Sequence, residues 1–351
     1  MQRKFCNGIH KHVKVLYINS HSADYVQDLT YYGLVKTLGL KNVIDFKWNQ
    51  KYHVPYKKYP KNLGYVPYSF IPSLINRSLK QFDMVFVGAA KVDCFETYME
   101  IAQRIPAGIP VVFIDGGDQP KIGADLTVYG RPELYHAAVE KRPFDVVFKR
   151  EMLIDTEYGQ NVFPVPMCFN TDRLKNIPSE KKYDVSFWAV ESDAIRIKAL
   201  DMLSSRFDCA ENGTVRNQKF SKYKRKGDFY LQELARCKVV LNFRGGGWDT
   251  LRYWEAPAVG SFMISQEPQI VIPYNFEHQK HVIFCQDDLS DLLDLCEYYL
   301  RHESQRETIA AAGKQHLLQY HSHNARARYI LERIAAWQNS QEHKSFAAIG
   351  V

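Results

Sequence analysis

The sequence predicts an α/β protein made of two domains, each built on a parallel sheet covered by helices. Short apolar runs alternate with amphipathic stretches along most of the chain, which is typical of strand–helix alternation. A polar stretch at residues 171–182, TDRLKNIPSEKK, interrupts this alternation, which then starts again. With 351 residues, the chain is long enough for two domains of ordinary size.

In the first half, four apolar runs rich in Val, Ile and Phe are predicted as buried strands: residues 13–20, 83–90, 110–117 and 144–150. Helical patterns lie between them at residues 24–38 and 93–104. We therefore expect a first Rossmann-like domain over residues 1–172 and a linker over 173–182.

The second half repeats the pattern, with predicted strands at residues 183–189, 238–243, 261–265 and 281–286. Helices are predicted at residues 193–207, 227–236, 288–300 and 304–338. The second domain is expected over residues 183–318, followed by a C-terminal helix over 319–339 and a frayed tail over 340–351. Ligands of open parallel sheets collect at the carboxyl ends of the strands, so two facing domains would place two ligands in a cleft.

The amino-acid composition narrows the possible class of protein but does not identify a ligand. The net charge of +7 and the pI of about 8.8 are compatible with an anionic ligand, a membrane surface or nucleic acid. Seven scattered cysteines form no CxxC pair, which argues against a disulfide framework or a zinc ribbon. No secretory signal and no membrane-spanning apolar run is found. These features favour a cytoplasmic protein, with peripheral membrane association as an option.

The most unusual stretch is RGGGWDTLRYWEAPAVG, residues 244–260, which follows an apolar run and leads into a predicted helix. Such a turn lets backbone N–H groups approach a phosphate at the start of a helix. The P-loop string GxxxxGK[ST] does not occur in the chain, and the dinucleotide string GxGxxG lacks its third glycine here. Both of these phosphate sites are therefore excluded.

The stretch ELARCKVVLNFRGGGWDTLRYWEAPAVGSFMIS resembles the donor-site signature of GT-B glycosyltransferases, in particular group 1 enzymes of the spore-maturation CgeB type. Similarity to that family continues in QDDLSDLLDLCEYYLRHESQRETIAAAGKQHLLQYHSHNARARYIL and in VLYINSHSADYVQDLTYYGLVKTLG. The resemblance covers most of the chain and is more specific in the C-terminal half. It implies a GT-B fold, with two Rossmann-like domains facing a cleft and a C-terminal helix that crosses back to the N-terminal domain.

The resemblance also assigns residues to the donor side. Glu255 matches the glutamate that accepts hydrogen bonds from the donor ribose, and a carboxylate can accept a vicinal diol bidentately. The glycines Gly245, Gly246 and Gly247 would bring main-chain amides to the diphosphate or the sugar. In the better-known retaining pattern a first glutamate stands where this chain has Gly247, and Asp249 is a candidate to replace it. Retention or inversion of the anomeric centre therefore stays open.

Three arginines are candidates for the diphosphate, because a guanidinium stays charged and meets phosphate in a planar fork: Arg196, Arg244 and Arg252. Surface or interdomain ion pairs are the alternative for Arg244 and Arg252. Lys149 and Arg150, at the end of a predicted strand, are expected to be structural.

On the acceptor side, the first strand-to-helix loop carries His21 and Asp24, either of which could act as a general base on an acceptor hydroxyl. Helix N-capping is the alternative for Asp24. A second loop carries Asp118 as a further catalytic candidate and Asp115 as an acceptor-side residue, although turn chemistry alone also explains its Asp-Gly pair. The Tyr- and Lys-rich stretch 51–70 adds the acceptor-side candidates Tyr56 and Tyr59. The resemblance implies no essential metal.

Together these points predict a metal-independent glycosyltransferase that has no cofactor and uses a UDP- or GDP-linked sugar. The expected acceptor is a glycan, a lipid-linked or another hydroxyl compound. Alternatives are a phage-type enzyme that glycosylates DNA, a nucleotide-sugar epimerase or hydrolase of the same fold, and a non-catalytic nucleotide- or carbohydrate-binding member.

Overall fold

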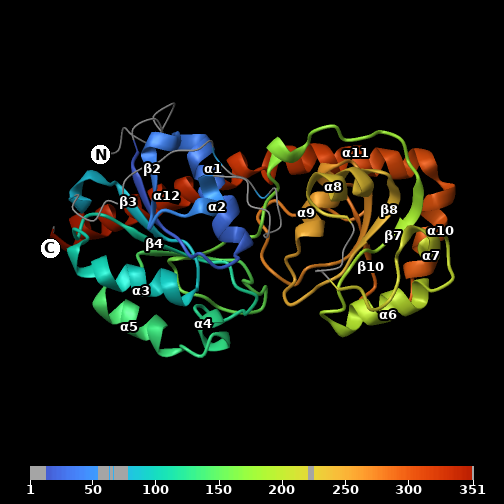
Figure 1. Cartoon of the computed structure of the whole chain (residues 1–351). Helices are drawn as coiled ribbons and strands as arrows, with labels where there is room; N and C mark the ends of the chain where they lie inside the picture. The colour runs from blue at the N-terminus through green and yellow to red at the C-terminus, as the bar shows by residue number, and fades with distance from the viewer. Residues whose placement is uncertain (1–12, 54–62, 64–65, 67–77, 220–224, 350–351) are drawn as a thin grey trace. The chain divides into compact units, whose positions relative to one another are not determined.

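The structure is a computed structural model that describes residues 13–53, 63, 66, 78–219 and 225–349 (Figure 1). These residues form two compact units. Unit 1 holds the described residues through His53, those from Val66 to Pro166, and those from His323 onward. Unit 2 holds Leu63 and Met167–Ser322. The main segment of the second unit thus begins at Met167, five residues before residue 172, the predicted end of the first domain.

Unit 1 is built on a six-stranded parallel sheet with the order β2-β1-β3-β4-β5-β6. Its strands are β1 (Val15–Ile18), β2 (Val43–Phe46), β3 (Met84–Val87), β4 (Val111–Asp115), β5 (Val146–Lys149) and β6 (Val162–Pro164). The sequence predicted four of them and missed β2 and β6, which are the two edge strands. β6 is the shortest strand of this sheet and ends on a proline, which an edge position tolerates because no partner strand needs its N–H.

Two layers of helices cover this sheet, as Figure 1 shows. The helices of unit 1 are α1 (Tyr25–Leu38), α2 (Gln50–His53), α3 (Val92–Ile101), α4 (Asp125–Val128), α5 (Glu133–Lys141) and α12 (His323–Ile349). Alternate strand residues such as Val85 and Phe113 pack with α3 and α5, while Phe148, of the opposite parity, meets Tyr329 of α12. Both faces of the sheet are therefore buried, which explains the near-continuous apolar runs of its strands.

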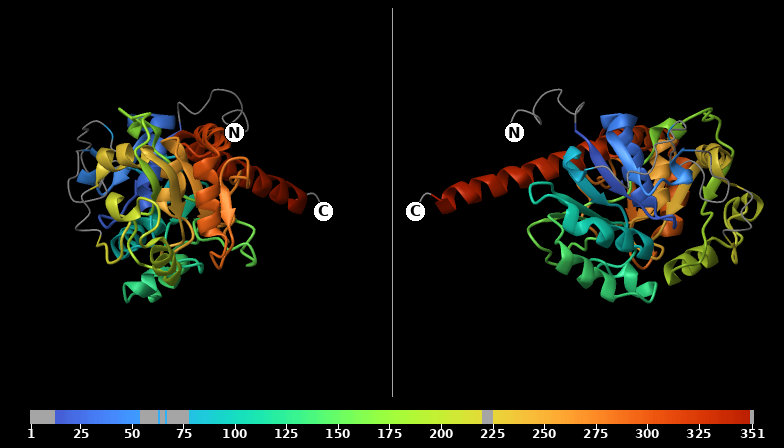
Figure 2. Two further views of the ribbon diagram at one scale, coloured as in Figure 1. Left: turned by 90° about the vertical axis from the view of Figure 1, so that its right-hand side faces the viewer. Right: turned by 60° about the vertical axis from the view of Figure 1, so that its left-hand side comes forward.

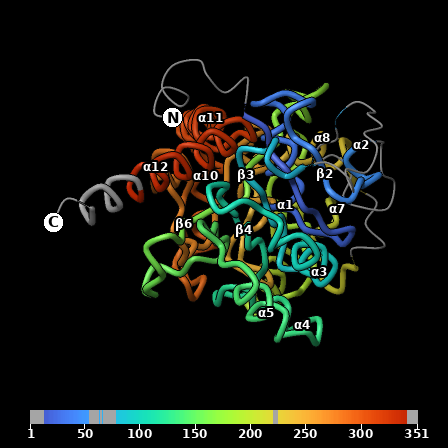
Figure 3. Tube along the Cα trace, turned by 90° about the vertical axis from the view of Figure 1, so that its left-hand side faces the viewer, coloured from blue at the N-terminus to red at the C-terminus, as the bar shows by residue number. Residues whose placement is uncertain are grey.

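The C-terminal helix α12 belongs to unit 1 and lies along α1 (Figure 3). A Cβ at Gly33 of α1 would stand 2.5 Å from the carbonyl oxygen of His323, so only glycine permits this approach. The single helix predicted over 304–338 is two helices, α11 (Glu303–Tyr320) and α12, which separate at His321 and Ser322. Helix α12 runs to Ile349, past residue 340 where a frayed tail was expected, and its last turns extend beyond the sheet (Figure 2).

Unit 2 is built on a four-stranded parallel sheet with the order β10-β9-β8-β7. Its strands are β7 (Tyr183–Ser186), β8 (Cys237–Asn242), β9 (Phe262–Gln266) and β10 (Ile283–Cys285), all four of which the sequence predicted. Its helices are α6 (Ala194–Leu203), α7 (Cys209–Asn212), α8 (Gly227–Ala235), α9 (Leu251–Ala258), α10 (Leu292–Arg301) and α11. Among the described helices of the whole chain, none is long and apolar enough to span a membrane.

Candidate active site

The glycine-rich stretch lies where predicted, between β8 and α9 at the carboxyl edge of the sheet of unit 2. Thr250 caps α9: its hydroxyl oxygen lies 3.4 Å from the N–H of Tyr253, and it donates its own hydrogen to Asn242 at the end of β8. At the other end of α9, Gly260 has a φ of 81° and turns the chain into β9. Thr250 thus fixes the first turn of α9 to β8. The N-terminus of α9 lies at the carboxyl edge of the sheet, where ligands of parallel sheets bind.

Close approach of Arg196 explains the first glycine of the triplet. A Cβ at Gly245 would stand 2.8 Å from Nη2 of Arg196. Arg196 donates Nε to the carbonyl of Arg244, Nη2 to that of Phe243 and Nη1 to that of Val190, at 2.7, 3.0 and 3.0 Å. The N–H of Gly245 bonds the carbonyl of Gly247 within the loop, while Gly246 is exposed and Gly247 is buried. Arg196, predicted as a phosphate ligand, therefore holds the loops after β7 and β8 together.

The other two predicted arginines differ in what remains available to a ligand. Arg252 donates to the carbonyl of Trp188 and lies over the ring of Phe187. Arg244 pairs with Asp193 at 3.3 Å and covers the Trp248 ring, and its side chain is 33% exposed. Since its contacts are a half-exposed ion pair and a ring face, Arg244 is the better placed of these two to meet an anion.

Glu255 lies in the second turn of α9, with only 6% of its surface exposed. One of its carboxylate oxygens, Oε1, is 3.2 Å from Nη1 of Arg173, which in turn packs over the ring of Phe169. Arg173 is the first residue of the predicted linker, and no functional role is predicted for it from the sequence. No local pattern could have revealed it, because its partner is 82 residues away.

Asp249 is not a replacement for the carboxylate missing at Gly247. It is 2% exposed, and its carboxylate accepts hydrogen bonds from the N–H of Met167 and from Nε1 of Trp254, at 2.5 and 2.7 Å. These bonds fasten the segment that enters unit 2 to the start of α9. The prediction for Asp249 is corrected accordingly: the residue has a structural task.

In unit 1 the strand order reverses between β1 and β3, and in parallel sheets such a reversal opens a crevice at the carboxyl edge. Loops from both strands meet there. Ser20 Oγ and the N–H of His21 donate to the two carboxylate oxygens of Asp93, at 2.6 and 2.9 Å. The side chain of His21 is exposed at this edge.

Asp24 follows in the same loop, and Gly116, which directly follows β4, lies against its carboxylate. Its carboxylate caps α1 through the N–H of Gln27 at 2.9 Å, as the alternative interpretation expected. A Cβ at Gly116 would stand 2.7 Å from Oδ1 of Asp24, and one at Gly117 would stand 2.3 Å from the Asp125 carboxylate. The glycine pair after β4 therefore makes room for two carboxylates, which turn chemistry alone had not suggested.

Burial raises the pKa of Asp24 to about 6, although the charges of Lys91 and Arg150 and the capping bond act in the opposite direction. Lys91 is itself buried, and its Nζ lies 2.7 Å from the Tyr129 hydroxyl and 3.4 Å from Asp125. A carboxyl group that changes protonation near neutral pH has the property required of a general base.

The remaining acceptor-side candidates have different surroundings. Asp118 is 53% exposed and pairs with Arg150 at 2.8 Å. Asp115 is 1% exposed and forms a buried ion pair with Lys149 at 3.1 Å, so its predicted contact with an acceptor is not supported. Lys149 is structural, as expected. Tyr56 and Tyr59 lie outside the described residues.

Comparisons with known proteins agree with this architecture. Residues 197–332 match a family model described as glycosyl transferase-like. A structure of Anabaena Alr3699/HepE in complex with UDP-glucose superposes with a TM-score of 0.58 at 11% identity, over 93% of this chain and 100% of that one. An alpha-glucosyltransferase in complex with UDP-glucose and DNA containing an abasic site gives 0.55 at 10% identity, over 92% and 99%.

Sucrose-phosphate synthase (tll1590) from Thermosynechococcus elongatus gives a TM-score of 0.53 at 12% identity, over 96% of this chain and 100% of that one. No curated protein sequence matches the chain. At these identities the similarity concerns the fold. The two parallel-sheet units, the carboxyl-edge sites and these superpositions together show that the chain has the GT-B fold of glycosyltransferases.

Proposed function

We propose that this protein is a glycosyltransferase that moves a sugar from a UDP-linked donor to a hydroxyl acceptor, and that it is related to the CgeB-type enzymes. Glu255 carries the proposal: a buried carboxylate on the helix that follows a glycine loop, with one oxygen on Arg173. The second oxygen would accept hydrogen bonds from the ribose hydroxyls, since an ionised carboxylate only accepts. The structures of Anabaena Alr3699/HepE and of the alpha-glucosyltransferase were solved with UDP-glucose, which favours uracil as the base.

In the proposed reaction, negative charge develops on the departing nucleoside diphosphate. The N-terminus of α9 and the half-exposed Arg244 would stabilise that charge, so the reaction would need neither a resident cofactor nor a metal. Asp24 would remove the proton of the acceptor hydroxyl if the sugar is inverted, with His21 as the alternative base. A retaining transfer would not require that base.

Donor binding can be tested by thermal-shift measurements with UDP, GDP, CDP and dTDP and with their sugars. A ligand at 100 times its Kd stabilises the folded protein by about 2.7 kcal/mol, so UDP and a UDP-sugar should raise Tm by several degrees. Release of UDP from the sugar in the presence of EDTA would support the metal-independent reaction. If no nucleotide shifts Tm, the proposal is wrong.

Transfer to DNA is a second candidate, because one structural relative was solved with DNA and this chain has a net charge of +7. DNA binding that weakens steeply as salt increases, together with sugar transfer to duplex DNA, would favour it. Binding that is absent at low salt would exclude it and leave a glycan or a lipid-linked hydroxyl as the acceptor.

A further inference from the structure

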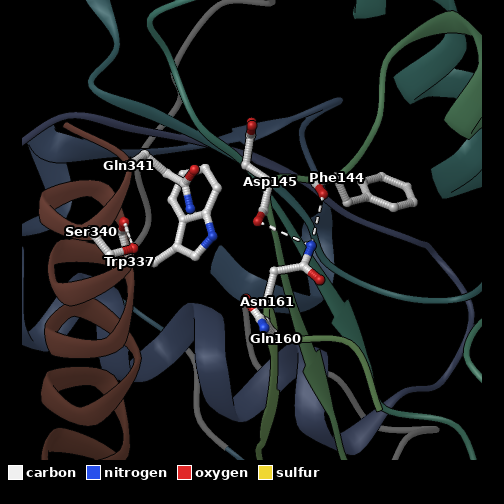
Figure 4. A pocket seen from close by; sticks show the side chains of 7 residues that line it. All are labelled: Phe144, Asp145, Gln160, Asn161, Trp337, Ser340 and Gln341. Carbon is white, nitrogen blue, oxygen red and sulfur yellow. Dashed lines mark hydrogen bonds between the residues drawn. The ribbon is translucent and has the colours of Figure 1, made fainter. Parts of the chain in front are cut away.

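A hollow of about 370 Å³ opens in unit 1 at the edge opposite to the candidate active site (Figure 4). Phe144 and Asp145 immediately precede β5, and Gln160 and Asn161 immediately precede β6, so this is the amino edge of the sheet. Trp337, Ser340 and Gln341 of α12 form the other wall. The volume lies at the lower end of the range of about 300–1,000 Å³ typical of small-molecule sites.

Hydrogen bonds fix the strand-side wall. The carboxamide nitrogen of Asn161 donates to the carbonyls of Phe144 and Asp145, at 3.3 and 3.2 Å, as the dashed lines in Figure 4 show. Asp145 accepts the N–H of Val111 at 2.7 Å. Phe144 is buried behind this wall against the ring of Phe113, 4.8 Å away. The wall is therefore formed before any ligand arrives.

The helix-side wall presents one aromatic face and several unused polar groups. Trp337, Ser340 and Gln341 have the i, i+3, i+4 spacing that places side chains on one face of a helix. Trp337 is half-buried. Within the described part of the chain, its indole N–H and the carboxamides of Gln160 and Gln341 have no hydrogen-bond partner in the protein.

The chemistry of these walls selects a kind of ligand. None of the seven lining residues is a Lys, Arg or His, so nothing in the lining would neutralise a phosphate or another anion. Carboxamides both donate and accept, as hydroxyl groups do, and an indole face packs against C–H groups. A ring with hydroxyl groups on its rim and C–H groups on its face satisfies all of these side chains.

We propose that this hollow binds a neutral saccharide unit, with the sugar ring on the face of Trp337 and its hydroxyl groups bonded to Gln160 and Gln341. Because the hollow is on the amino edge, away from Asp24 and His21 in the same unit, the bound sugar would be held without being a reactant. The inference does not depend on the proposed function.

The test follows the indole N–H signals of ¹⁵N-labelled protein, which has five tryptophans. Loss of one signal in Trp337→Phe assigns Trp337. The wild type is then titrated with methyl α-D-glucopyranoside, methyl α-D-mannopyranoside and N-acetyl-D-glucosamine, and with D-glucuronate as the charged counterpart. We expect the Trp337 signal to move with a Kd of roughly millimolar magnitude for at least one neutral sugar and not for glucuronate.

The double change Gln160→Ala and Gln341→Ala should weaken binding about tenfold, whereas Gln315→Ala, an exposed glutamine of α11, should not. Glu255→Gln should leave the titration unchanged, which separates this site from the proposed donor site. A Trp337 signal that stays still up to about 100 mM of every neutral sugar would overturn the proposal. Equal binding by the Gln160/Gln341 variant or stronger binding of glucuronate would do the same.

Discussion

The carboxyl edges of the two sheets use charged side chains in different ways. In unit 2, Arg196 and Arg252 are bonded to backbone carbonyls, and the carboxylates of Asp249 and Glu255 hold the segment that enters the unit. In unit 1, Asp24 is buried between glycine backbone and cations, and its pKa is raised to about 6. Unit 2 thus fixes the shape of a loop, whereas unit 1 adjusts the proton affinity of a single group.

This difference is expected if the carboxyl edge of unit 2 binds the donor and that of unit 1 transfers a proton. A diphosphate site needs rigid backbone donors and a helix terminus, and the arginine–carbonyl bonds supply that rigidity. A general base needs a pKa near the working pH, which burial provides. Variants that disturb one edge should therefore change different measured quantities from variants that disturb the other.

The largest expected effect comes from Asp24→Asn. If Asp24 is the general base, this change should lower kcat by about 10²–10⁴-fold with little change in the donor KM. The same change should stabilise the protein at pH 8. The pKa of Asp24 in the folded protein, about 6, lies above the ordinary value of 3.8, so the free energy of unfolding falls as pH rises from about 4 to about 6.

The two pH units between these values correspond to about 3 kcal/mol, which Asn would recover because it is uncharged and still caps the helix. Urea unfolding at pH 4 and pH 8 measures the effect. Asp83→Asn serves as the control, because Asp83 also accepts a backbone N–H in unit 1 but lies at the amino edge. An Asp24→Asn enzyme with full activity would remove Asp24 from the mechanism, and the anomeric configuration of the product would then distinguish a retaining transfer from an inverting transfer with His21 as the base.

Glu255→Gln should act on donor binding. Two hydrogen bonds to a charged acceptor would be weakened, and each is worth about 1.5–3 kcal/mol, so we expect the donor KM to rise about 100-fold or more. The UDP-dependent rise in Tm should disappear as well. Because unit 1 is untouched, the pH dependence of kcat should stay the same, and a shifted pH profile would contradict the separation of the two edges.

The sequence predicted the strands of unit 2, the glycine loop and the helix of Glu255, because all of these follow from local periodicity and from residues close in the chain. It did not predict the edge strands β2 and β6: β6 has only three residues, and the four residues of β2 include the charged Asp45, which breaks the apolar run. Nor did it predict the roles of Arg196 and Asp249. Whether a guanidinium or a carboxylate meets a ligand or a backbone group depends on chain segments far away in sequence, as the bond from Met167 to Asp249 illustrates.

Arg173 offers a smaller and more specific test within unit 2. Arg173→Ala leaves the buried carboxylate of Glu255 without its cation, so we expect about a tenfold rise in donor KM with kcat nearly unchanged. Arg173→Lys keeps the charge and should recover most of the loss, which a purely structural defect would not predict. Arg236→Ala, at a more exposed ion pair with Glu233, is the matched control. A change confined to Tm, with KM unaffected, would mean that Arg173 only supports the fold.

The smallest expected effect is on the pH dependence of stability. Loss of a buried histidine, His281, should stabilise the protein at low pH, whereas Asp24→Asn should stabilise it at high pH. Burial and the nearby His316, with ring centroids 4.1 Å apart, lower the pKa of His281 in unit 2 to about 4, against the opposing charge of Glu277. The unfolded chain therefore binds the proton more tightly, and the free energy of unfolding falls as pH drops from 6.5 towards 4. His281→Gln should raise Tm by about 2–4 °C at pH 5 and leave it unchanged at pH 7.5.

His302→Gln, at an exposed histidine, should have no such pH-dependent effect. The stabilisation by Asp24→Asn should grow as pH rises from about 4 to about 6, and that by His281→Gln should grow as pH drops from 6.5 towards 4. Opposite slopes of the two variants against pH would show that each unit responds to protons through its own buried group, whereas parallel slopes would refute that separation.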